Sequence, residues 1–179
     1  IFTAALRKLI EAGEVALDRT WVRRPGHEVK FSPEEEQIWQ AIKPMLAREP
    51  YRPPRVRDIA NAMDIPEAFV RRLMHMAARR GDLDEIAHDH FFLRSTVQTM
   101  AEIAIDIASQ SPSGKFTAAE FRDRLQNGRK VAIQILEFFD RHGFTIRRQD
   151  LRRINPARVE FFAPKAPDRD GGVPLPVER

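Results

Sequence analysis

The residues whose type and spacing could do chemistry are the cations of the last third of the chain. Residues 115–153 hold ten Lys and Arg against five Asp and Glu, a net charge of +5 that exceeds the +4 of the whole chain. Cationic side chains bind phosphate oxygens, and guanidinium groups also pair with guanine edges or stack on an unpaired base. Charge focused in this way is typical of a nucleic-acid contact. The plainer alternative is a solvated basic face.

One group of cations opens a predicted helix. Arg129 and Lys130 follow Gly128, and the apolar residues that come next recur at helical spacing. The first N–H groups of a helix have no partner within the helix, and its positive end favours an anion. We therefore expect Arg129 and Lys130 to hold a phosphate.

The other group surrounds a predicted turn at Gln149 and Asp150. Residues 144–148 and 151–154 are expected to form two short strands on either side of it. Their cations are Arg147, Arg148, Arg152 and Arg153. Successive strand residues face opposite ways, so at least one cation of each adjacent pair can face a ligand. A helix followed at once by a basic hairpin predicts the recognition helix and wing of a winged-helix domain.

The same order of helix, glycine and hairpin occurs three times, around Gly13, Gly81 and Gly143. The predicted fold class is therefore mainly α with small β-hairpins (α+β), built of tandem winged-helix modules. We expect a partial module at 1–30 (third helix and wing), a module at 31–95, another at 96–163, and a disordered tail at 164–179. The middle hairpin has an acidic tip, so we expect that module to act as a spacer and hinge.

Local signals place several helix ends. Ser32 with Glu35, and Thr117 with Glu120, have the spacing of capping boxes. Pro44 lies inside the helix that Ser32 opens, and we expect it to kink that helix or end it early.

Other motifs lack residues that their chemistry needs. Gly114-Lys115 has neither the first glycine nor the following hydroxyl of a phosphate loop, so we reject that reading. His88-Asp89-His90 has no obvious further metal ligand and is better explained as a solvated turn. No nucleophile with a base can be proposed, so catalytic and metal residues are both predicted as none.

The composition limits the possible cellular locations and classes of site. The chain has no cysteine, which excludes disulfides and thiolate metal sites and fits a reducing, cytoplasmic location. No apolar run approaches the roughly 20 residues that span a bilayer. The chain opens inside a helical pattern, so we interpret it as a fragment of a longer protein.

Three motifs carry a family resemblance: FTAAEFRDRL at 116–125, GRKVAI at 128–133 and ILEFFDRHGFT at 135–145. In them the last module resembles the C-terminal end of the bacterial selenocysteine-specific translation elongation factor, SelB. The earlier modules resemble it only in architecture. The resemblance implies tandem winged-helix modules, the last of which binds an mRNA hairpin beside a UGA codon. It also implies a GTPase domain outside this chain. That domain would use GTP and magnesium and deliver selenocysteinyl-tRNA to the ribosome.

In that family the start of the recognition helix and the wing arginines grip the hairpin loop. The resemblance therefore implies RNA contacts by Arg129, Lys130, Arg147 and Arg148. We expect secondary contacts by Lys115, Gln149 and Arg152. Ile146 stands where some members carry an arginine, so the number of wing contacts is open.

We expect a monomer with no cofactor in this fragment. Two alternatives remain open at this point. One is a double-stranded DNA-binding transcription regulator whose third helix enters the major groove. The other is a winged-helix protein-interaction scaffold.

Overall fold

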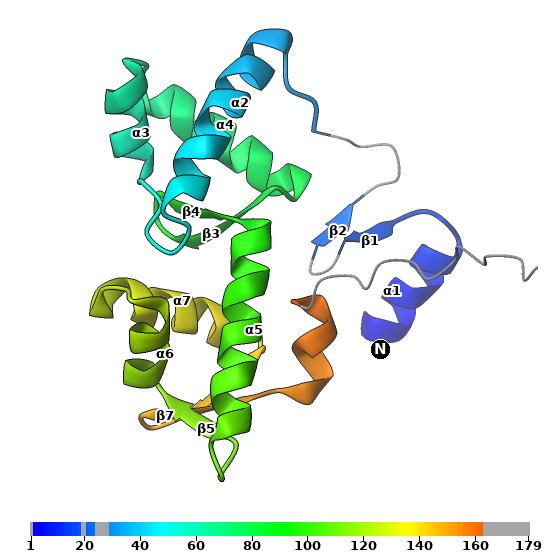
Figure 1. Cartoon of the computed structure of the whole chain (residues 1–179). Coiled ribbons are helices and arrows are strands. Elements are labelled where there is room, and N and C mark those ends of the chain that lie inside the picture. Colours follow the sequence, from blue (N-terminus) through cyan, green and yellow to red (C-terminus); the bar gives the residue numbers. More distant parts are fainter. Residues whose placement is uncertain (1, 19–20, 24–28, 163–179) are drawn as a thin grey trace, which may run out of the picture.

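A computed structural model describes residues 2–18, 21–23 and 29–162 (Figure 1). The predicted tail at 164–179 lies outside these residues. The chain opens with α1 (Phe2–Glu11) and an antiparallel hairpin of β1 (Ala16–Asp18) and β2 (Trp21–Arg23). Two winged-helix units follow, so the fold is mainly helical with small antiparallel sheets, as predicted.

The middle unit comprises residues 33–93. It contains α2 (Pro33–Arg48), α3 (Val56–Met63) and α4 (Glu67–Arg80), closed by an antiparallel hairpin of β3 (Leu83–Ala87) and β4 (His90–Leu93). The capping box that starts α2 is confirmed, because Ser32 Oγ accepts from the Glu35 N–H at 3.2 Å and the Glu35 carboxylate accepts from the Ser32 N–H at 2.9 Å. Gly81 ends α4 with a left-handed φ of 92°.

Pro44 does not end α2 early, because the helix continues past it to Arg48, whereas a kink at Pro44 stays a prediction. Proline removes one helical hydrogen bond and costs roughly 3 kcal/mol in a helix interior. Pro44 and Gln40, whose carbonyl loses its partner, both lie on the exposed face, where water can replace that bond. Trp39, Ile42 and Leu46 are buried on the other face and hold the helix against the core on both sides of the proline.

The last unit comprises residues 94–162. It runs through α5 (Arg94–Gln110), β5 (Lys115–Thr117), α6 (Ala118–Leu125), α7 (Arg129–Arg141), β6 (Thr145–Arg148), β7 (Leu151–Ile154) and a final 3-10 helix, η1 (Pro156–Phe161). The capping box at Thr117 and Glu120 is confirmed. Strand β5 was not expected; it pairs with β7 and completes a three-stranded antiparallel sheet in the order β5-β7-β6.

Aromatic side chains fill the core of the last unit. Phe139 of α7 lies at its centre, with ring centroids 4.9 Å from Phe144 and 6.4 Å from Phe121. The helical periodicity of α7 is confirmed, since Ile135, Phe138 and Phe139 are buried. This packing fixes the orientation of α7 and therefore the position of its first turn.

The middle and last units share apolar packing. Strand β4 ends at Leu93 and α5 begins at Arg94, so there is no linker between the units (Figure 1). Ile86 and Phe92 of the middle hairpin are buried in the apolar cluster of the last unit. Apolar packing therefore joins the two units, and the role of the middle module as a spacer and hinge stays a prediction.

None of the helices among residues 2–18, 21–23 and 29–162 is long and apolar enough to cross a membrane.

Candidate nucleic-acid interface

The start of α7 presents exposed cations and uncapped backbone. Gly128 is the N-cap in an extended conformation, and no side chain caps the helix from that position. Its own N–H donates to Asn127 Oδ1 at 2.7 Å. Arg129 and Lys130 are both exposed in the first helical turn. Together with the helix's positive end, this arrangement suits a bound phosphate.

The register of the wing sends its two neighbouring arginines to opposite faces. Arg147 pairs with Arg152 across the sheet, and Arg148 pairs with Leu151. Because paired residues share a face and neighbours alternate, Arg147 and Arg152 lie on the face of the sheet that carries buried Phe116. Arg148 lies on the other face, which it shares with the exposed cations Lys115 and Arg153.

Arg152, for which we expected a secondary RNA contact, is largely buried. Its side chain is only 4% exposed and forms an ion pair with Asp140 of α7 at 3.0 Å. The alternation of the strand turns Arg153 outward and Arg152 inward, where a carboxylate neutralises it. Arg152 therefore supports the wing from beneath.

A basic groove separates the start of α7 from the wing. It is a pocket of about 370 Å³, lined by Thr117, Ala118, Ala119, Arg122, Arg129, Ile133, Arg147, Asp150 and Arg152. The structure thus brings Arg129, Arg147 and Arg152 to one pocket, with Arg152 paired to Asp140. Lys130, Arg148, Lys115 and Gln149 are exposed but do not line it.

Sequence reasoning missed Arg122 as a candidate. It lies on α6, lines the groove, and pairs with neighbouring Asp123 at 2.5 Å. Its position inside the motif at 116–125 was the available signal, but only the tertiary packing of α6 against α7 places it beside Arg129. Arg147 is held by a hydrogen bond from its Nε to the carbonyl of Gln149 at 2.9 Å.

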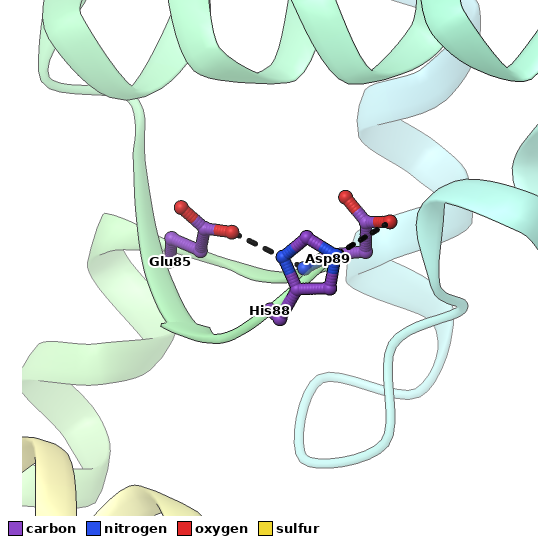
Figure 2. Close-up of side chains that lie close together, drawn as sticks. All are labelled: Glu85, His88 and Asp89. Atoms are coloured by element: carbon purple, nitrogen blue, oxygen red, sulfur yellow. Dashed lines mark hydrogen bonds and ion pairs between the residues drawn. The ribbon is translucent and has the colours of Figure 1, made fainter.

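The middle hairpin gathers possible metal ligands at its tip. One ligand atom each of Glu85, His88 and Asp89 lies within 4.8 Å of the others (Figure 2). Asp89 is already bound by Arg71, which donates to its two carboxylate oxygens at 2.8 and 2.7 Å. Glu85 accepts from the Asp89 N–H at 3.1 Å. These hydrogen bonds explain why the three side chains lie together at a tight turn. His90 is buried and is not part of the cluster.

The fold and the groove define a tandem winged-helix protein with a basic surface between its last recognition helix and wing. Two family models match: "Selenocysteine-specific elongation factor, winged helix domain" at residues 31–92, and "Elongation factor SelB, winged helix" at residues 108–154. The chain belongs to the SelB family and corresponds to its winged-helix region.

Two full-length selenocysteine-specific elongation factors are similar to this chain in sequence. The chain is 37% identical over 143 residues to the selenocysteine-specific elongation factor of Escherichia coli, covering 80% of this chain and 22% of that protein. It is 34% identical over 141 residues to that of Haemophilus influenzae, covering 79% of this chain. The chain thus spans about 22% of the length of these relatives.

A solved structure is also similar. It is described as the mRNA-binding domain of elongation factor SelB from E. coli in complex with SECIS RNA. The TM-score is 0.63 at 37% sequence identity, over 70% of this chain and 99% of that one.

Proposed function

We propose that the last unit binds an mRNA hairpin, a selenocysteine insertion element of the SECIS type. The observation that carries this is the likeness to the E. coli domain, which is described in complex with SECIS RNA and is covered to 99% at 37% identity. The groove between Arg129 and Arg147 supports it, because it offers guanidinium groups beside an uncapped helix start. The shared chemistry is recognition of a phosphate backbone next to accessible bases.

The groove suggests a division of labour. Arg129 and Lys130 hold backbone phosphates together with the first N–H groups of α7. Arg147 enters the same groove from the wing and contacts a loop base, because the deep groove of A-form RNA is closed to a helix. Arg148, Lys115 and Gln149 contact the flanking backbone from the outer side of the wing.

The role of the longer protein follows from the family. In this proposal a GTPase outside this chain, using GTP and magnesium, delivers selenocysteinyl-tRNA to the ribosome at a UGA codon that the hairpin marks. This fragment performs no catalysis and works in the cytoplasm as a monomer. Its task is to tether the factor to the correct message.

Fluorescence anisotropy tests the binding. The chain is titrated against a SECIS hairpin, the same stem with a scrambled loop, and a DNA duplex of equal length, over a series of salt concentrations. We expect the SECIS hairpin to bind at least tenfold more tightly than the other two, a difference of roughly 1.4 kcal/mol. Tighter binding to the duplex would point to a DNA regulator instead. Weak binding to all three would favour a protein-interaction scaffold.

A further inference from the structure

A second pocket lies where the middle and last units meet. Its volume is about 380 Å³, and we call it the seam pocket. It is lined by Arg52, Pro53, Arg55, Asp58 and His90 of the middle unit and by Asn127, Gly128 and Val131 of the last. The first turn of α7 therefore contributes residues to both the seam pocket and the basic groove.

Two hydrogen bonds fix the middle unit beside the start of α7. Asn127 is 7% exposed, and its Nδ2 donates to the carbonyl of Tyr51 at 2.7 Å. The Arg52 guanidinium donates to the carbonyl of Gln126. The loop between α2 and α3 is thus held against the turn that leads into α7, and its arginines have a defined position relative to Gly128.

The seam pocket carries positive charge that these contacts do not use up. A guanidinium has five N–H donors. Arg52 is exposed and gives one hydrogen bond to Gln126, and half-buried Arg55 gives one to the carbonyl of His88 at 3.2 Å. The one acid in the lining, Asp58, accepts the backbone N–H of Arg55 at 3.0 Å. Two cations and the positive end of α7 outweigh that carboxylate.

The lining also contains a buried polar atom that has no hydrogen-bond partner in the described part of the chain. His90 is 3% exposed, and its Nε2 must donate to the Pro53 carbonyl at 3.1 Å, since a carbonyl can only accept. Burial first, and then the charge of Arg55, lowers the pKa of His90, so the ring is neutral near pH 7. Its Nδ1 has no hydrogen-bond partner among the described residues. Buried acceptors are rarely left unpaired, so this nitrogen needs a donor that the described residues do not supply, such as a water.

We propose that the seam pocket binds a backbone phosphate of the same RNA that occupies the basic groove, with Arg52 and Arg55 as its ligands. This rests on the proposed function. The first turn of α7 separates the two pockets: Arg129 lines the basic groove, whereas Gly128 and Val131 line the seam pocket. An RNA strand crossing that turn presents phosphates to both. The middle unit is then a direct part of the RNA-binding surface.

The test is the salt dependence of SECIS-hairpin binding by the chain with Arg52→Gln or Arg55→Gln. Removing one phosphate contact lowers the slope of log K against log salt by about 0.7 to 0.9. We expect that drop for each variant. The matched control is Arg79→Gln, which removes an exposed charge of the same unit from a different pocket, beside His75 and Phe138. We expect it to keep the wild-type slope.

Two further measurements distinguish phosphate binding by Arg52 from a purely structural role of its hydrogen bond to Gln126. Arg52→Lys keeps the charge, and we expect it to keep the slope. If Arg52→Gln lowers the melting temperature but leaves the slope unchanged, Arg52 only holds Gln126 and the seam proposal is overturned. Wild-type slopes in both Gln variants, with intact loop selectivity, overturn the seam proposal and leave the proposed function standing. Loss of loop selectivity in the wild-type chain overturns both.

Discussion

The guanidinium of Arg152 lies against the carboxylate of Asp140, with hydrogen bonds of 3.1 and 3.0 Å from its Nε and a terminal nitrogen to Oδ2. Asp140 belongs to the last turn of α7 and Arg152 to β7 of the wing. Thr145 of β6 donates to the same carboxylate at 2.5 Å. This network ties the wing to α7. Since Arg147 pairs directly with Arg152, it also fixes Arg147 relative to Arg129.

Breaking this network should destabilise the chain. Asp140→Asn removes the charge that neutralises buried Arg152, and an uncompensated buried charge costs roughly 3 kcal/mol. We expect a loss of that size in the free energy of unfolding by urea, and weaker binding of the SECIS hairpin. Glu137→Gln, an exposed change on the same helix, should stay within about 0.5 kcal/mol of wild type. Equal stability of the two variants would show that the ion pair contributes nothing.

Local chemistry made much of the fold predictable. The capping boxes at Ser32 and Thr117 and the apolar stripe of α7 depend on residues close in sequence, and the structure confirms them. Pro44 does not end α2, and the buried residues on the opposite face of the helix offset its local penalty. Strand β5 was missed because only its pairing with distant β7 makes three residues a strand.

For the candidate site, too, local sequence signals were predictable and tertiary contacts were not. Charge clustering identified Arg129 and Arg147, which share the basic groove. Strand alternation predicted that at least one of Arg152 and Arg153 could face a ligand, but choosing between them requires the register with Phe116 and the position of Asp140. Arg52 and Arg55 could not be connected with the site from sequence, because tertiary packing alone brings them to Gly128.

Stability should fall in acid partly through Asp89. Hydrogen bonds from Arg71 are the main cause that lowers the pKa of Asp89 below its ordinary value of 3.8. At pH values between the lowered pKa and the ordinary pKa, the unfolded chain binds more protons than the folded chain. The stability that the ionised Asp89 contributes is therefore present above about pH 4 and is lost as pH falls through the lowered pKa. In urea unfolding at pH 5, 4 and 3, the stability difference between wild type and Asp89→Asn should shrink with each step.

The partner of Asp89 supplies the control for that experiment. In an Arg71→Gln background, Asp89→Asn should change stability by a nearly constant amount over the same pH series. The pH-dependent difference would then belong to the pair. If it survives the loss of Arg71, another group is responsible and our assignment is wrong.

The shared core should make the middle and last units unfold together. Ile86 belongs to the middle hairpin, is 1% exposed, and packs in the apolar cluster of the last unit. Ile86→Ala should cost roughly 3 kcal/mol. Native-state hydrogen exchange should show faster exchange of the most protected amides in both α4 and α7. Acceleration confined to one of these helices would show that the units open separately.

In the proposed function, Arg129 and Arg147 act together on one RNA hairpin across the basic groove. The most direct measurement is a double-mutant cycle on SECIS-hairpin affinity, with Arg129→Ala, Arg147→Ala and both. Residues that hold a ligand within one pocket couple, and Arg129 and Arg147 line the same groove, so we expect about 1 kcal/mol of coupling here. The cycle of Arg129 with Arg148, which lies on the other face of the wing, should be additive within about 0.5 kcal/mol. Additivity of Arg129 with Arg147, or coupling of Arg129 with Arg148 in its place, would show that Arg129 and Arg147 do not act together on the RNA.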